Sequence, residues 1–140
     1  MTVVVDASVA LKWFLPDEPE TDRALAILRG GEVLAAPDLI FAEVCNGAWK
    51  SARLGRITQN QVSEIATALP TFFGRVRGSG SLATRGVEIA GWLDHPVYDC
   101  LYIALAEMEQ CALVTADLQL IARIRGTEWK TIATALANYR

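Results

Sequence analysis

Apolar and polar residues alternate along the chain in blocks that predict strands and helices in turn. Short apolar runs with the length of buried strands occupy residues 3–5, 33–35 and 113–115, and further candidate strands lie at 72–76 and 129–132. Stretches with helical spacing lie between them, at residues 7–15, 17–28, 37–53, 58–69, 81–93, 97–107 and 118–124. This alternation predicts an α/β sandwich with a mainly parallel central sheet flanked by helices.

Length and composition agree with a single folded domain over residues 1–140. Hydrophobic residues make up 52% of the chain and charged residues 21%, which excludes a disordered protein. The formal net charge of −3 does not indicate nucleic-acid binding, so a polyanionic ligand would need a locally basic surface or bound cations. No apolar run approaches the length of a membrane span, and the first residues do not resemble a signal peptide, so we expect a cytoplasmic protein.

The three cysteines are odd in number and widely spaced, at positions 45, 100 and 111. They form no C-x-x-C pair, which argues against a zinc site. We therefore expect reduced and mostly buried thiols.

Three acidic residues stand where the predicted chain changes direction. Asp6 ends the first predicted strand, Asp117 follows the strand at 113–115, and Asp99 opens the helix VYDCLYIALAE. Binding sites in parallel α/β sheets form outside the carboxyl ends of the strands. Each of these acids could instead cap a helix, because Asp oxygens accept the free N–H groups of a first turn. Position alone leaves both interpretations open.

A fourth acid, Glu43, lies inside the helix predicted for residues 37–53. A plot at 100° per residue places Glu43 with Asn46 and Lys50, opposite an apolar face that contains Val44 and Ala48. Helical periodicity therefore predicts that Glu43 belongs to a solvent-exposed polar face.

Four segments carry a resemblance to a known family: VVVDASVALKWFLPDEP, APDLIFAEVCNGAWKSARLGRIT, HPVYDCLYIALAE and LVTADLQL. In this order and spacing the chain resembles PIN-domain ribonucleases, specifically the VapC-type toxins of bacterial type II toxin–antitoxin systems. The four acids of the family match Asp6, Glu43, Asp99 and Asp117, and Ser8 follows the first. The segment from Phe72 to Gly86 matches poorly, so nothing is carried over there.

The resemblance implies a PIN-like three-layer sandwich and an acidic pocket that binds Mg²⁺ or Mn²⁺ and cleaves RNA. Asp6 and Asp99 are the expected metal ligands. Glu43 and Asp117 would orient water at the metal or complete a second site, and Ser8 and Thr115 could hydrogen-bond the acids or a phosphate. Such cations prefer oxygen ligands, and they can activate water and neutralise a phosphate.

The resemblance further implies an antitoxin protein as partner and a homodimer. Lys12 and Lys50 are the expected RNA contacts, because both lie on helices that carry motif residues. His95 reads as a surface loop histidine, although a role as general base is conceivable. The large aromatic residues are expected in the core or in a dimer contact: Trp13, Phe14, Trp49, Trp92 and Trp129.

Two other functions compete with a nuclease. One is a PIN-fold module that binds RNA or protein without cleavage, against which the complete set of four acids argues. The other is a receiver-like phosphoacceptor domain, which is also α/β with clustered acids. It would need an acceptor Asp at the end of a central strand near the middle of the chain, and none is found there.

Overall fold

The computed structural model describes all 140 residues. Its centre is a five-stranded sheet of order β3-β2-β1-β4-β5, in which every neighbouring pair is parallel. The strands are β1 (Thr2–Val5), β2 (Val33–Pro37), β3 (Arg75–Arg77), β4 (Leu113–Thr115) and β5 (Ala133–Ala135). The prediction of a mainly parallel sheet is therefore confirmed, and β1 occupies its centre.

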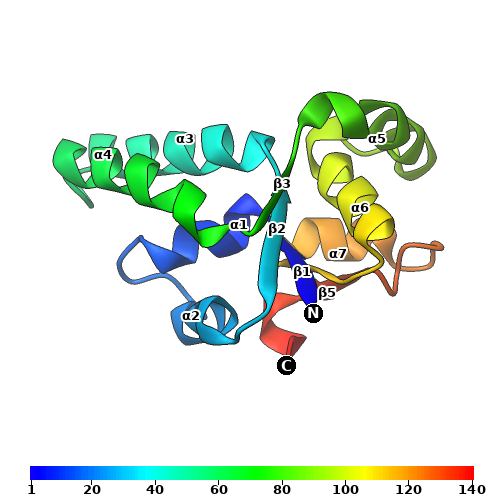
Figure 1. The fold of residues 1–140 in the computed structure, drawn as a ribbon, viewed down its shortest axis with the longest axis horizontal. Helices are drawn as coiled ribbons and strands as arrows, with labels where there is room; N and C mark the ends of the chain where they lie inside the picture. Colours follow the sequence, from blue (N-terminus) through cyan, green and yellow to red (C-terminus); the bar gives the residue numbers. More distant parts are fainter.

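Helices cover both faces of the sheet. They are α1 (Ala7–Ala10), α2 (Thr21–Arg29), α3 (Leu39–Arg53), α4 (Gln59–Ala68), α5 (Ser79–Leu93), α6 (Val97–Glu109) and α7 (Leu118–Ile124), with 3₁₀ turns at Leu11–Trp13, Leu69–Phe72 and Leu136–Asn138. Helices α1 to α4 lie on one side of the sheet, and α5 to α7 lie on the other (Figure 1). This is the three-layer arrangement expected for a PIN-like fold.

Helix α6 is the most deeply buried helix because it lies between the sheet and α5. Its residues 100–106 are all buried, which explains why the segment is apolar on every side. The close approach of α5 depends on Gly86, where an added Cβ would lie 2.7 Å from Leu101 Cδ2. No helix combines the length and the apolarity that a membrane crossing requires.

Several element boundaries differ from the sequence prediction. Pro37 ends β2, where it pairs with Arg77, and does not open a helix; α3 starts at Leu39. The helix expected at 7–15 is a short α-helix followed by a 3₁₀ turn. Asp17 and Glu20 adopt left-handed backbone angles, which delays the start of α2 to Thr21.

Two predicted strands were misplaced. The strand expected at 72–76 begins only at Arg75, because the preceding residues form a 3₁₀ turn around Pro70. The strand expected at 129–132 lies at Ala133–Ala135. Trp129 is instead buried outside the sheet, where its indole N–H donates to Glu107 Oε2 at 3.0 Å. A buried aromatic side chain can therefore imitate a strand in the hydrophobic pattern.

Candidate acid site at the carboxyl edge of the sheet

Asp6 is the most buried of the four candidate acids. It follows β1 and is 6% exposed. One carboxylate oxygen accepts hydrogen bonds from Ser8 Oγ at 2.5 Å and from the backbone N–H of Val9 at 3.3 Å, and the Thr115 hydroxyl donates to the other. Burial raises the pKa of Asp6 to about 6, an effect that these hydrogen bonds oppose and the charge of Asp99 adds to.

Ser8 and Thr115 therefore contact the acid, as expected, and join the ends of the two central strands. Ser8 Oγ accepts the backbone N–H of Ala116 at 2.9 Å, and Thr115 Oγ1 accepts that of Asp117 at 3.0 Å. Since β1 and β4 are parallel neighbours, their carboxyl ends meet at the same edge. The pair of hydroxyls fixes the position of Asp6 within that edge.

Glu43 does not lie on a solvent-exposed face, so the prediction from helical periodicity was wrong. It is partly buried, and its Oε1 accepts a hydrogen bond from the Tyr102 hydroxyl of α6 at 2.5 Å. Burial raises the pKa of Glu43 and the charge of Asp99 adds to that rise, while the Tyr102 bond opposes it. Tyr102 was not identified from the sequence, although a tyrosine in the buried middle of a helix needs a partner for its hydroxyl.

Asp99 is not a helix cap. It lies in the first turn of α6, where Pro96 takes the N-cap position, and its carboxylate accepts no backbone N–H. Its Oδ2 accepts a hydrogen bond from His95 Nε2 at 2.6 Å. The His95 side chain is only 13% exposed, so the expectation of a surface loop histidine was wrong. The spacing of four residues between His95 and Asp99 could have indicated this pair.

Asp117 does act as a helix cap. Its Oδ1 accepts the backbone N–H groups of Gln119 at 2.9 Å and Leu120 at 3.3 Å at the start of α7. The backbone N–H of Asp117 donates to Thr115 Oγ1, and the Thr115 hydroxyl donates in turn to Asp6. The second oxygen of this carboxylate has no recorded hydrogen bond, so capping leaves one oxygen available for a ligand.

Asp6, Glu43 and Asp99 form a group of acids without matching cations. The charge of Asp99 acts on the other two, and no Lys or Arg nitrogen lies within 4.0 Å of any of the three. The carboxylates do not form a closed cage, because no three His, Cys, Asp or Glu side chains are grouped tightly enough to hold an ion. A hydrated Mg²⁺ fits this arrangement, since it commonly uses one or two carboxylates and keeps several waters.

The two lysines expected to contact RNA have different surroundings. Lys12 is 8% exposed, and its Nζ donates to the carbonyl of Pro19 at 2.8 Å. This contact holds the segment before α2 and argues against Lys12 as a surface contact to RNA, which no observation tests directly. Lys50 is exposed beside Arg53 and Leu54 around a hollow of about 310 Å³ on α3. Its RNA contact remains a prediction.

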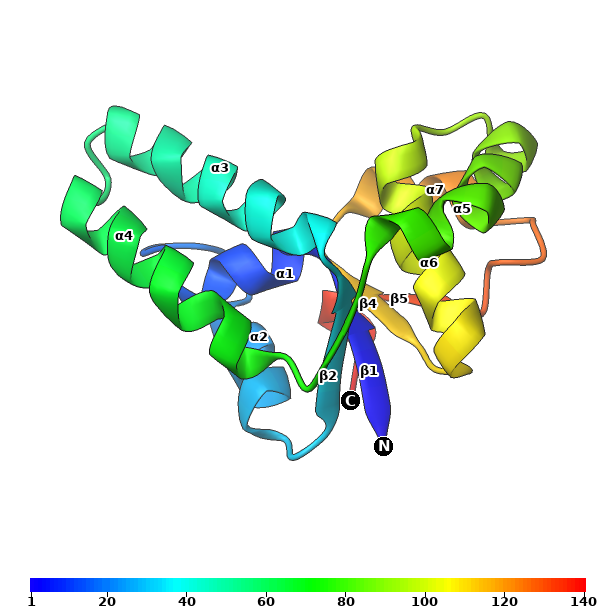
Figure 2. The ribbon, with the colours of Figure 1, turned by 45° about the horizontal axis from the view of Figure 1, so that its top comes forward.

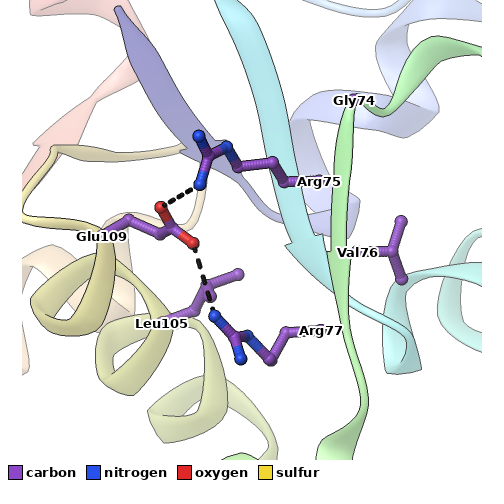
Figure 3. Close-up of a pocket in the computed structure, with 6 residues that line it drawn as sticks. All are labelled: Gly74, Arg75, Val76, Arg77, Leu105 and Glu109. Atoms are coloured by element: carbon purple, nitrogen blue, oxygen red, sulfur yellow. Dashed lines mark hydrogen bonds and ion pairs between the residues drawn. The ribbon is translucent and has the colours of Figure 1, made fainter.

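The poorly matched segment carries an arginine cluster away from the acids. Arg75 and Arg77 reach from β3 to Glu109 at the end of α6, with N···O distances of 3.2 and 3.9 Å (Figure 3). Val76 points to the other side of the strand in the same view. Glu109 lies ten residues beyond Asp99, which is about 15 Å along the helix axis. These arginines therefore neutralise a different acid.

The aromatic residues divide into two groups. Trp13, Phe14 and Phe72 pack against one another at centroid distances of 5.7–6.3 Å beside the core, and Trp129 is buried, which confirms the expected core positions. Trp49 and Trp92 are 44% and 79% exposed, so a dimer contact remains a prediction for them. All three cysteines are free, as expected.

Comparison with known proteins places the chain in a family. Residues 3–126 match the PIN domain. Ribonuclease VapC3 of Pyrobaculum aerophilum is 34% identical over 122 residues, covering 86% of this chain and 92% of that protein. Ribonuclease VapC9 of Mycobacterium tuberculosis is 36% identical over 121 residues, covering 84% and 87%.

The fold agrees with this match. A toxin-antitoxin complex from Klebsiella pneumoniae contains a chain that superposes with a TM-score of 0.69 at 18% identity, covering 96% of this chain and 97% of that one. The chain belongs to the PIN-domain family and is similar to its VapC ribonucleases.

Proposed function

We propose that this protein is a metal-dependent endoribonuclease and the toxin of a toxin–antitoxin pair. The observation that carries the proposal is the group of three acids at the carboxyl edge, in which the charge of Asp99 acts on both Asp6 and Glu43 and no Lys or Arg nitrogen lies within 4.0 Å. Such a group is costly to the fold: burial and the charge of Asp99 together raise the pKa of Asp6 to about 6 against the opposing hydrogen bonds from Ser8, Thr115 and Val9. A divalent cation would supply the missing charge. The VapC ribonucleases to which the chain is similar support RNA as the substrate.

Asp6 and Asp99 would hold the cation, Mg²⁺ or Mn²⁺. When bound, it would lower the pKa of a water molecule and neutralise charge on the phosphodiester. Ser8 and Thr115 fix both oxygens of Asp6, and His95 fixes one oxygen of Asp99. Tyr102 orients Glu43 and leaves its second oxygen free to accept a proton from the attacking water. Asp117 would bind through the oxygen that does not cap α7.

We also propose a protein antitoxin and a homodimer as assemblies of this chain. The toxin-antitoxin complex of similar fold motivates the first. Exposed apolar side chains provide surface for both: Trp49 and Leu54 at the outer part of α3, and Trp92 near the end of α5. Figure 2 shows that α3 and α5 project on opposite sides of the sheet, so two separate contacts are geometrically compatible. With RNA as its substrate, the protein would act in the cytoplasm.

The decisive experiment is RNA cleavage by the purified protein with and without EDTA. Cleavage should stop in EDTA and return on addition of Mg²⁺ or Mn²⁺. Asp6→Asn should abolish it, while Asp94→Asn should not, because Asp94 is an exposed acid at the end of α5 outside the group. Asn tolerates the left-handed backbone at that position. Cleavage that persists in EDTA would contradict the metal requirement, and RNA binding without cleavage would identify a non-catalytic module.

A further inference from the structure

A cleft lies directly beside the acid site, between the loop that precedes α6 and the exposed side of α7. It has a volume of about 470 Å³ and is lined by His95, Gln119, Ala122 and Arg123. Sites for small molecules commonly measure about 300–1,000 Å³, so the cleft can accept one nucleotide unit. Gln119 and Arg123 are four residues apart on α7 and therefore occupy the same face of that helix.

Both walls of the cleft connect to candidate catalytic acids. On one wall, His95 Nε2 donates to Asp99 Oδ2 at 2.6 Å. On the other, the backbone N–H of Gln119 donates to Asp117 Oδ1 at 2.9 Å. A chain of nucleotides that places one phosphate at the acids would therefore extend its neighbour into this cleft.

Arg123 is the only cation that lines the cleft, and it has no acidic partner. The arginines that form ion pairs in this structure are Arg56, Arg75, Arg77 and Arg85. A basic residue in the last turn of α7 can interact favourably with the helix dipole, which accounts for a positive charge there. The dipole does not account for a hollow lined by an amide and an imidazole beside that charge.

We propose that this cleft is an RNA subsite in which Arg123 binds the phosphate next to the scissile one. The proposal rests on the endoribonuclease function proposed above. A guanidinium presents paired N–H donors that match a phosphate, and it is always charged. Its position in the cleft supplies local positive charge to a protein of net charge −3 without neutralising the acids themselves. Gln119 and His95 form the walls against which the attached nucleotide would lie.

The test combines a protein variant with a change in the substrate. A short RNA that the wild-type protein cleaves is synthesised in two versions. Each version carries a single neutral methylphosphonate in place of one of the two phosphates that flank the cleaved bond. At one of the two flanking positions, the methylphosphonate should lower kcat/KM roughly tenfold to a hundredfold. Arg123→Ala should cause a similar loss of kcat/KM on unmodified RNA. Once either partner is absent, removing the other should cost little more, because the same contact is lost only once.

Arg125→Ala is the matched control, since Arg125 is an exposed arginine two residues away that does not line the cleft. It should keep near wild-type cleavage and the full methylphosphonate effect. A melting temperature of Arg123→Ala equal to that of the wild type would show that the fold is intact. Arg123→Lys keeps the charge and should cause a smaller loss of cleavage. If the methylphosphonate lowers kcat/KM of Arg123→Ala by the same factor as that of the wild type, the two losses are independent. That result would overturn the subsite proposal and leave the nuclease proposal standing. An absence of cleavage by the wild-type protein would overturn the nuclease proposal and the subsite with it.

Discussion

The acidic residues at the two ends of helix α6 have opposite electrostatic surroundings. At its start, the charge of Asp99 acts on Asp6 and Glu43, and His95 is the one side chain that hydrogen-bonds to Asp99. At its end, Arg85 binds Glu107 through two hydrogen bonds of 2.8 and 2.9 Å, and the Trp129 indole donates a third. Arg85 lowers the pKa of Glu107, whereas burial raises the pKa of Asp6 and Glu43.

This contrast distinguishes acids whose charge stabilises the fold from acids whose charge destabilises it. The chain carries 13 Lys and Arg residues and uses several of them to neutralise the far end of α6. It places none against the three acids at the carboxyl edge. Groups with perturbed pKa values that persist at a cost to stability are typical of functional sites. The difference between the two ends can be tested by removing charge from each.

The largest expected effect is the loss of cleavage in Asp99→Asn. Removing a candidate metal ligand should lower kcat by a factor of about 100 or more. Without metal, the melting temperature should be unchanged or higher, because repulsion with Asp6 and Glu43 is relieved. Glu109→Gln at the other end of α6 is the control and should cleave RNA normally per folded molecule. Near-normal cleavage by Asp99→Asn would remove this residue from the site.

The pH dependence of stability should have opposite signs at the two ends. Folding raises the pKa of Asp6 from 3.8 to about 6, so the folded state binds the proton more tightly. The contribution of Asp6 to stability is therefore greatest below pH 4 and is lost as the pH rises to about 6, by about 3 kcal/mol at most. Glu107, with its lowered pKa, loses its contribution as the pH falls instead.

Urea unfolding of the wild type and Asp6→Asn from pH 3.5 to 7, in EDTA, would measure this difference. The variant should become relatively more stable as the pH rises through that range. A constant difference between the two proteins would show that Asp6 titrates normally.

A smaller effect is expected when charge is removed at the far end of α6. Glu107→Gln weakens the bonds from Arg85 and Trp129 and should lower the free energy of unfolding by about 1–2 kcal/mol, a value discounted for partial exposure. Cleavage by the folded fraction should not change. Urea unfolding and a cleavage assay below the unfolding transition measure both quantities. Loss of cleavage without loss of stability would show that the two ends are coupled.

The smallest effect is expected from loss of the hydrogen bond that joins Tyr102 on α6 to Glu43 on α3. Tyr102→Phe removes the hydroxyl that donates to Glu43 and leaves the packing of α6 intact. That bond lowers the pKa of Glu43, so its loss should raise this pKa and move the acidic limb of the pH–cleavage profile upward. Stability should fall by about 1 kcal/mol. An unchanged pH profile would indicate that Glu43 does not titrate in the reaction.

The fold was largely predictable because strand and helix alternate with distinct periods, as in residues 113–115 and 118–124, where both predicted elements agree with β4 and α7. Errors arose where tertiary contacts override local pattern. Trp129 is buried outside the sheet, where it donates a hydrogen bond to Glu107, and the left-handed residues Asp17 and Glu20 interrupt a helical pattern.

The site was predictable from residue positions only where an acid follows a strand. Asp6 and Asp117 meet that condition, whereas Glu43 depends on the distant Tyr102 and contradicts the period of its own helix. The resemblance to PIN-domain ribonucleases identified Glu43 when periodicity did not. Neither approach identified Tyr102 as the partner of Glu43, because the two residues lie 59 positions apart, whereas the spacing of four residues between His95 and Asp99 contained a local signal that was not used.

The central position of β1 has a consequence for protein synthesis. Asp6 is translated 109 residues before Thr115, whose hydroxyl fixes it. At about 5–20 residues per second, a ribosome needs roughly 5–20 s to make the intervening segment. Until then, β1 lacks its β4 neighbour and the edge that gathers the acids does not exist. A nascent chain that has not yet reached β4 therefore cannot assemble the acid site, and a product truncated before Thr115 should not cleave RNA.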